Sequence, residues 1–170
     1  MRRFVLGPLV LGSLVLGLIL LGACTTHAPS SASWGNATVV KVTDGDTISV
    51  MVNGTNEKVR LIGIDTPETK KPDTPVQCFG PEASAFTASL LPVGTEVRLE
   101  RDVEPRDKYG RLLAYVYLVA DRTFVNLQIV RQGYARLLTI PPNVAHSDEF
   151  VVAARAAEAD DIGLWAGCTG

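Results

Sequence analysis

The sequence lacks the basic excess expected of a protein that coats nucleic acid. It contains 16 Lys and Arg residues against 18 Asp and Glu residues, which gives a formal net charge of −2 at pH 7. An anionic substrate would therefore have to be held by a local cluster of cations, because the chain as a whole does not attract it. The sequence also lacks a CxxC pattern, which argues against a structural zinc site, and it shows no internal repeat.

The N-terminus has the layout of a secretory signal. "MRR" is basic, and the following "FVLGPLVLGSLVLGLILLGA" is apolar and uncharged. The run is long enough to make a transmembrane anchor an alternative, although Pro8 and the glycines weaken it as a long helix. It ends in "LGAC", which resembles a bacterial lipobox, in which the cysteine is lipidated and becomes the new N-terminus. We expect residues 1–23 to be a lipoprotein signal peptide and Cys24 to carry a lipid anchor at the bacterial membrane or surface, with ordinary signal cleavage as a further alternative.

Cleavage before Cys24 would leave one domain's worth of chain. It would remove two arginines and no acids, so that the mature chain keeps 14 basic and 18 acidic residues, a net charge of −4. The small, polar residues 24–36 predict a flexible tether, and residues 37–168 predict the folded domain. The remaining cysteines, Cys78 and Cys168, form a candidate disulfide, since disulfides persist in exported proteins; two unrelated free thiols are the alternative.

The pattern of apolar residues predicts an α+β fold that is mainly β. Strands are indicated by the β-branched segments 37–42, 47–52, 57–64, 95–101 and 111–119, and helices by 80–91, 125–133 and 148–160. Asn53-Gly54 between the second and third strands is a two-residue hairpin signal. Five short strands with a helix after the third fit a five-stranded Greek-key barrel of the oligonucleotide-binding (OB) type, here with three helices.

Three charged stretches have ordinary structural explanations. Asp44-Gly45-Asp46 has the composition of a turn, and the segment 65–68 could begin a helix, with Thr66 as its cap and Pro67 in its first turn. "RDKYGR", residues 106–111, could be a charged hairpin turn. Each explanation would suffice for one stretch in isolation.

Taken together, the three stretches predict a site for phosphodiester chemistry. Asp46 and Asp65 lie at the ends of neighbouring predicted strands and could offer hard oxygen ligands to calcium. Arg60 and Arg111 could clamp a phosphate, because each guanidinium donates two parallel hydrogen bonds. Glu68 could accept a proton from an attacking water. A metal, a carboxylate and two arginines are the parts that phosphodiester hydrolysis requires.

The chain resembles the staphylococcal nuclease (thermonuclease) family over residues 37–165, nearly all of the mature domain. The resemblance rests on five blocks that occur in the family's order: "DGDT" at 44–47, "RLIGIDTPE" at 60–68, "FGPEASAFT" at 79–87, "DKYGRLLAYVY" at 107–117 and "VNLQIVRQGYA" at 125–135. It implies a five-stranded barrel with three helices, and a calcium-dependent nuclease that acts on DNA and RNA and leaves 3′-phosphates. We further expect a monomer.

The resemblance implies a role for each matching residue of the metal site. Asp46 and Asp65 match the carboxylate ligands of calcium, Thr66 matches a ligand that uses its backbone carbonyl, and Asp44 matches an acid that supports the site.

It also implies the roles of the residues around the substrate. Glu68 matches the general base, and Arg60 and Arg111 match the pair on the scissile phosphate. Lys108 and Tyr109 match residues that contact a nucleotide phosphate.

The sequence departs from the family where tyrosines pack against the nucleotide, because Thr139 and Pro141 fall near those places. Two other functions stay open from the sequence: a catalytically weak OB-fold lipoprotein that only binds nucleic acid, and a surface lipoprotein whose calcium site is purely structural. The first conflicts with the presence of the whole catalytic set, and the second leaves Arg60 and Arg111 without a role.

Overall fold

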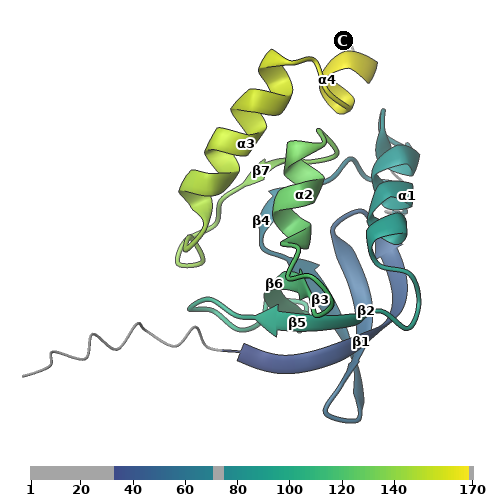
Figure 1. The fold of residues 1–170 in the computed structure, drawn as a ribbon, viewed down its shortest axis with the longest axis vertical. Helices are drawn as coiled ribbons and strands as arrows, with labels where there is room; N and C mark the ends of the chain where they lie inside the picture. The colour runs from purple at the N-terminus through teal and green to yellow at the C-terminus, as the bar shows by residue number, and fades with distance from the viewer. Residues whose placement is uncertain (1–32, 71–74, 169–170) are drawn as a thin grey trace, which may run out of the picture. The chain divides into compact units, whose positions relative to one another are not determined.

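Five strands close into a barrel, and the helices gather at one end of it (Figure 1). The structure, a computed structural model, describes residues 33–70 and 75–168, so the predicted signal peptide, Cys24 and residues 24–32 of the predicted tether lie outside the described residues. Around the barrel the strands follow the order β1-β2-β3-β6-β5. Their bounds are Ser33–Asp44 (β1), Thr47–Val52 (β2), Thr55–Leu61 (β3), Glu96–Glu100 (β5) and Leu112–Leu118 (β6).

All neighbouring pairs of barrel strands are antiparallel except β3 and β6, which pair in parallel. The hairpin predicted at Asn53-Gly54 is present: Val52 pairs with Thr55, and both turn residues have positive φ, 50° and 77°, as a tight hairpin turn requires. The predicted OB-type barrel, α+β and mainly β, is thereby confirmed.

The first strand begins earlier than predicted. β1 starts at Ser33, four residues before the expected domain start at Ala37, because Ser33, Gly35 and Asn36 pair with β5. The residues 33–36 therefore belong to the barrel and not to the tether. Ser33, Gly35 and Asn36 concealed this, because they contribute backbone pairing and no buried side chain, whereas Trp34 packs against the core.

The third predicted strand divides in two. β3 ends at Leu61, and a separate strand, β4 (Gly63–Asp65), leaves the barrel to pair with β7 (Arg136–Leu138) in a small antiparallel sheet. At the break, the backbone N–H of Ile62 still donates to the carbonyl of Ala114 in β6, at 3.0 Å. The change of direction after Leu61 carries Asp65 away from the barrel wall and toward its rim.

The three predicted helices are present as α1 (Gly80–Leu90), α2 (Val125–Arg131) and α3 (Ser147–Ala159). The first turn of α1 contains Pro81, which suits the start of a helix, and Glu82, whose charge complements the helix dipole. The described residues also contain a short fourth helix, α4 (Leu164–Gly167), which the sequence did not predict. A four-residue helix is too short to show a hydrophobic period.

One buried side chain of α2 joins the helix to the barrel. Asn126 is fully buried and donates to the carbonyls of Ile62, at 2.9 Å, and Ala114, at 3.3 Å. Its side-chain oxygen accepts from the backbone N–H of Val116, at 2.9 Å. These bonds satisfy backbone groups at the point where the chain leaves β3 for β4.

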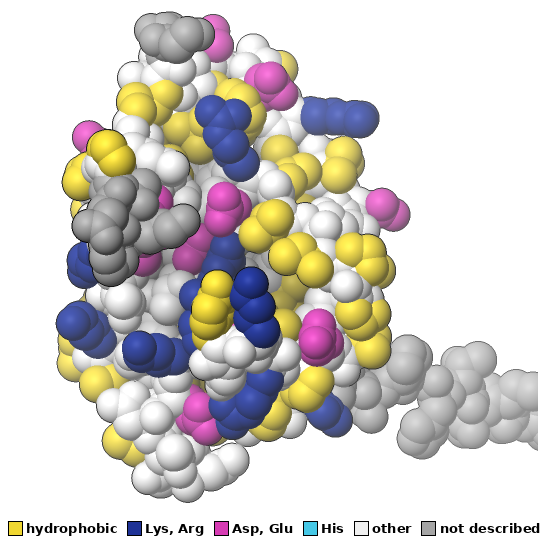
Figure 2. Space-filling model, turned by 180° about the vertical axis from the view of Figure 1, so that it is seen from behind, with side chains coloured by type: hydrophobic (Ala, Val, Ile, Leu, Met, Phe, Trp, Pro, Cys, Tyr) yellow, Lys and Arg dark blue, Asp and Glu magenta, His cyan; other side chains and the backbone are white. Residues whose placement is uncertain are grey.

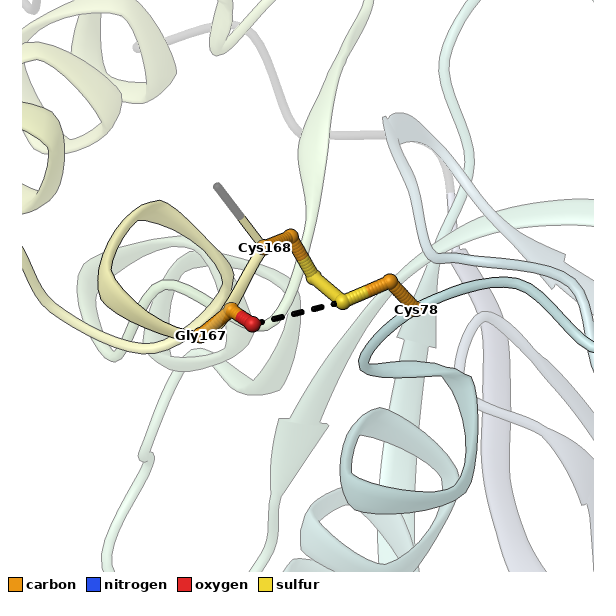
Figure 3. The surroundings of a disulfide bond; sticks show 3 residues. All are labelled: Cys78, Gly167 and Cys168. Atoms are coloured by element: carbon orange, nitrogen blue, oxygen red, sulfur yellow. Dashed lines mark hydrogen bonds between the residues drawn. A yellow bond between two sulfur atoms is a disulfide. The ribbon is translucent and has the colours of Figure 1, made fainter. Parts of the chain in front are cut away.

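Cys78 and Cys168 are joined in a disulfide, the pairing expected from the sequence (Figure 3). The bond connects the segment before α1 to the end of α4, over a sequence separation of 90. The sulfur of Cys78 also lies 3.4 Å from the carbonyl oxygen of Gly167, a contact and not a hydrogen bond, since a disulfide sulfur carries no proton.

Among the described residues, no helix has the length and apolar character needed to cross a membrane.

Candidate active site

The acidic and basic residues singled out in the sequence come together at one rim of the barrel. Asp46 follows the turn between β1 and β2, and its carbonyl accepts from the N–H of Leu61, at 2.9 Å. Arg60 lies on β3 opposite Thr47, and Asp65 ends β4. On the face drawn in Figure 2, Lys and Arg side chains lie above and below a group of Asp and Glu side chains near the middle of the view.

Arg60 bridges the two carboxylates. Its Nη2 lies 3.1 Å from Oδ2 of Asp46 and 3.0 Å from Oδ1 of Asp65. Its Nη1 donates to the carbonyls of Leu61, at 2.7 Å, and Ile64, at 2.8 Å. The side chains of Arg60 and Asp46 are only 13% and 11% exposed, whereas that of Asp65 is 57% exposed. The guanidinium is thus held in one orientation by four acceptors, and the cluster opens to solvent on the Asp65 side.

The charges in this cluster are crowded. Partial burial raises the pKa of Asp65, the Arg60 guanidinium lowers it, and the negative charge of Asp46 raises it again, so that the pKa of Asp65 lies above its ordinary value. In this structure the guanidinium of Arg60 balances the charge of both carboxylates, and the exposed side of Asp65 is where a further cation could approach.

The residues present fit a hard cation such as calcium. Calcium accepts carboxylates, backbone carbonyls and water in flexible numbers, so Asp46, Asp65 and the carbonyl of Thr66 with water could form its shell. Within residues 33–70 and 75–168, no cluster of three or more His, Cys, Asp or Glu side chains is arranged to hold a metal. A cation here would therefore depend on carbonyl and water oxygens in addition to the two carboxylates.

Thr66 is held against Asp46 by the turn that precedes β2. Its backbone N–H donates to Oδ2 of Asp46, at 3.1 Å, and Thr66 is buried. A Cβ added to Gly45 would lie 2.7 to 2.8 Å from the Thr66 side chain, which is too close. The glycine of Asp44-Gly45-Asp46 is therefore required by this close approach.

Asp44 supports the loop that carries Glu68. Its Oδ1 accepts hydrogen bonds from the hydroxyls of Thr69 and Ser84, both at 2.8 Å, and from the N–H of Gly45, at 2.9 Å. Burial raises the pKa of Asp44. Hydrogen bonds with Ser84, Glu68, Thr69 and the Gly45 N–H lower it by more in total, so that the pKa of Asp44 lies below its ordinary value. Asp44 thus links the β1–β2 turn, the Glu68 loop and α1.

Glu68 is fixed by its own loop. Its Oε1 accepts from the backbone N–H groups of Thr69, at 3.0 Å, and Lys70, at 2.8 Å. The backbone of Glu68 exchanges two hydrogen bonds with Gln77: its N–H donates to the Gln77 side chain and its carbonyl accepts from the Gln77 N–H, both at 2.9 Å. Gln77 precedes the disulfide cysteine Cys78, so the covalent crosslink adjoins the loop that positions Glu68.

Arg111 is oriented by Asp107, at the other end of the "DKYGR" turn. Its Nε donates to Oδ2 of Asp107, at 2.6 Å, and its backbone N–H donates to Oδ1, at 3.0 Å. Its Nη1 reaches the hydroxyl of Thr47, at 3.4 Å, and that hydroxyl donates to Oδ1 of Asp46, at 3.0 Å. The two arginines are therefore connected through Thr47 and Asp46.

A cavity of about 410 Å³ opens beside the two arginines. Lys108 and Tyr109 also line it, and Tyr109 is 73% exposed, with its ring 5.1 Å from Nζ of Lys108 and 5.5 Å from Cζ of Arg111. The structure thus places both predicted substrate residues at the cavity. The rest of its wall combines aliphatic side chains, among them Ile62, Leu113, Leu138 and Ile140, with the polar side chains of Glu104, Asp107 and Asn143.

The segment in which the sequence departs from the family pattern borders this cavity. Leu138 and Ile140 line it, and Thr139 and Pro141 are not among the lining residues. The described residues therefore offer a nucleotide aliphatic contacts from this segment, and Tyr109 is the aromatic side chain that lines the cavity.

Several residues that hold the site were missed in the sequence. Asp107 pairs with Arg111 across a turn, where the four-residue spacing that signals an ion pair on a helix does not apply. Ser84 and Gln77 gave no signal either: Ser84 meets Asp44 across 40 residues, and Gln77 meets Glu68 across a loop. Pairings that depend on tertiary structure leave no local pattern.

Comparison with known proteins gives consistent matches over this region. A family model described as "Staphylococcal nuclease homologue" matches residues 58–167, which include Arg60, Glu68 and Arg111. The chain is 47% identical over 127 residues to "Thermonuclease" of Staphylococcus intermedius, covering 75% of this chain and 74% of that protein. It is 40% identical over 136 residues to "Thermonuclease" of Staphylococcus hyicus, covering 80% and 79%. It is 39% identical over 145 residues to "Endonuclease YncB" of Bacillus subtilis, covering 84% and 67%.

Proposed function

Because the chain belongs to the staphylococcal nuclease family and is a nuclease, we propose that it is a calcium-dependent phosphodiesterase that cleaves both DNA and RNA and leaves 3′-phosphates. The observation that supports this most directly is that two arginine side chains face the same cavity and are connected through intermediate residues. Arg60 and Arg111 are linked through Asp46 and Thr47 and border one cavity. Neither sugar nor base identity is read by this arrangement, since phosphate contacts carry no sequence information.

In this proposal each residue of the site has a separate role in the reaction. Arg60 and Arg111 donate to the non-bridging oxygens of the scissile phosphate, on which negative charge increases during attack. Glu68 accepts a proton from the attacking water as the water oxygen bonds to phosphorus. The bond from phosphorus to the 5′ oxygen breaks, the departing 5′ oxygen takes a proton from solvent, and the phosphate stays on the 3′ side. Calcium held by Asp46, Asp65 and the Thr66 carbonyl would neutralise charge on the phosphate.

The test uses the mature chain with Cys24→Ser, which removes the predicted lipid anchor and a free thiol. Single-stranded DNA and RNA oligonucleotides are incubated with the protein in calcium, and in excess chelator, and the ends of the products are determined by mass spectrometry. We expect cleavage of both in calcium only, with 3′-phosphate products. Undiminished cleavage in chelator would exclude the metal dependence, and 3′-hydroxyl products would exclude the proposed bond cleavage.

We further propose that the nuclease acts as a monomer at the bacterial cell surface, anchored by lipid on Cys24. The support is the "LGAC" sequence directly after the apolar run. The Cys24→Ala protein should appear in the soluble fraction, or persist as the unprocessed precursor. Unchanged mature size together with unchanged membrane association would show that another feature holds the protein there.

A further inference from the structure

A second aromatic and basic cluster lies outside the cavity and surrounds Trp34, on the part of β1 that the sequence assigned to the tether. Trp34 is half-buried and packs against the core. The guanidinium carbons of Arg101 and Arg106 each lie 5.8 Å from the centre of its ring. The indole thus lies next to two cations on the barrel surface.

Arg106 connects this cluster to the active site. Its Nη1 donates to the carbonyl of Gly110, at 2.7 Å, in the turn that also presents Tyr109 and Arg111. Going outward from the active site, contacts therefore lead from Arg111 to Tyr109, through the turn to Arg106, and on to Trp34 and Arg101. On the face drawn in Figure 2, Lys and Arg side chains lie below the centre of the view, interspersed with hydrophobic, Asp and Glu side chains.

Of the two arginines beside Trp34, one is ion-paired with a carboxylate and the other is not. Arg106 forms a two-pronged pair with Glu57, at 3.0 and 2.8 Å, so it is fixed and largely neutralised. Arg101 is exposed, and no ion pair to it is found in the described part of the chain. In a chain with an acidic total, an exposed arginine without an ion pair, beside an aromatic ring, is a local attraction for an anion.

Aromatic rings and cations in alternation are the features with which proteins hold single-stranded nucleic acid. Bases stack on the rings without regard to sequence, and the cations follow the phosphates. A duplex has no unstacked bases to offer, so such a row favours single strands.

We infer that Trp34 and Arg101 form an accessory subsite for a single-stranded nucleic acid, which leaves the catalytic cavity over Tyr109 and Arg106 and stacks a base on Trp34. The inference rests on the proposed function for the position of the scissile phosphate. Through this subsite, residues outside the catalytic set favour substrates that are single-stranded and long enough to reach Trp34.

Trp34 can report on its own subsite. The chain has two tryptophans, and the second, Trp165, lies beside Arg136, at 5.0 Å. In the mature Cys24→Ser chain with Trp165→Phe, emission comes from Trp34 alone. Titration in excess chelator should show saturable quenching by a ten-residue oligothymidylate and no quenching by the dinucleotide d(pTpT). Binding of the dye-labelled ten-residue strand is followed in parallel by anisotropy, and gels verify that the strand stays intact.

Two variants measure the contribution of the subsite. Trp34→Ala should weaken binding of the ten-residue strand about tenfold, the scale of one lost stacking contact, and leave the rate of d(pTpT) cleavage unchanged. Arg101→Gln should reduce the slope of log affinity against log salt by about 0.7, the value for one phosphate contact to a single strand. Arg155→Gln removes an exposed arginine from α3 and is the matched control, for which no change is expected.

The outcomes separate this inference from the proposed function. Saturation of anisotropy without quenching of Trp34 would overturn the subsite, as would an unchanged salt slope in Arg101→Gln. Both readouts are obtained without cleavage, so they hold even if the proposed calcium-dependent reaction fails. If Trp34→Ala lowers the melting temperature strongly, the exposed Arg101→Gln and the fluorescence titration still decide the question.

Discussion

Arg111 owes its orientation to one carboxylate. Asp107 is 17% exposed and bonds both the Nε and the backbone N–H of Arg111. Burial raises the pKa of Asp107, but the bonds from Arg111 lower it by more, so that the pKa lies below its ordinary value. The ionised form of Asp107 is therefore the one that the folded chain prefers.

We predict that Asp107→Asn lowers kcat by about tenfold, because the amide keeps the acceptor for the backbone but loses the charge that fixes the guanidinium. Steady-state kinetics in saturating calcium measure the effect. Asp121→Asn is the control, since Asp121 accepts hydrogen bonds from Thr123 in a surface turn and forms no ion pair among the described residues. An unchanged kcat in Asp107→Asn would show that Arg111 does not need this partner.

The same carboxylate contributes stability with a definite pH dependence. A pKa that is lower in the folded chain gives a contribution that is fully present above the unfolded pKa of about 3.9 and is lost as pH falls through the folded value. Thermal melts should therefore show Asp107→Asn to be less stable than the parent near pH 7, with the difference vanishing below the folded pKa. A difference that grew on acidification would have the wrong sign.

At the scale of elements, α2 is held to the barrel by Asn126. Replacing it with alanine leaves the N–H of Val116 and the carbonyl of Ile62 buried without their side-chain partner. We predict a loss of about 3 kcal/mol in the free energy of unfolding, measured by urea titration. Gln128 lies two residues further along α2 and is only partly buried, so Gln128→Ala should cost less than about 1 kcal/mol. Equal losses in the two variants would contradict this role for Asn126.

The sequence predicted the barrel because each of its strands is long enough to show β-branched alternation, as in β1, where Ala37 and Val39 are buried and Thr38 is exposed. It did not predict β4 and β7, since a three-residue strand has no measurable period. The start of β1 was placed too late because Ser33 to Asn36 contribute backbone pairing and few buried side chains.

The sequence indicated the charged residues of the candidate site because their side chains have recognisable chemistry; their catalytic roles stay predictions. Asp46, Asp65, Arg60 and Arg111 are charged residues at strand ends, and the structure brings them together. The residues that hold them in place, such as Thr47 and Ser84, are ordinary polar residues whose contribution depends on which segments meet in space.

At the scale of the whole domain, the disulfide closes a loop that contains most of the fold. Cys78 and Cys168 are 90 positions apart, and crosslinks of that span stabilise by about 4 kcal/mol in the chain-entropy model. In the Cys24→Ser background, the Cys78→Ser, Cys168→Ser variant should therefore melt at a markedly lower temperature than the parent. A reductant should lower the melting temperature of the parent and leave that of the variant unchanged. Identical melts for oxidised parent and variant would show that the crosslink does not stabilise the fold.

The most direct measurement of the whole account is single-turnover cleavage of single-stranded DNA in saturating calcium by Arg60→Lys and Glu68→Gln, with thermal melts alongside. Lysine lacks the paired planar donors of Arg60, so its rate should fall by about 100-fold or more. Glutamine keeps the shape of Glu68 but cannot accept the proton, so its rate should fall by about 100- to 10,000-fold. We expect Glu68→Gln to melt near the parent, and Arg60→Lys to melt lower but to stay folded at the assay temperature, because one lysine ammonium cannot satisfy all four acceptors of the Arg60 guanidinium. Near-parent rates in both variants would contradict the mechanism.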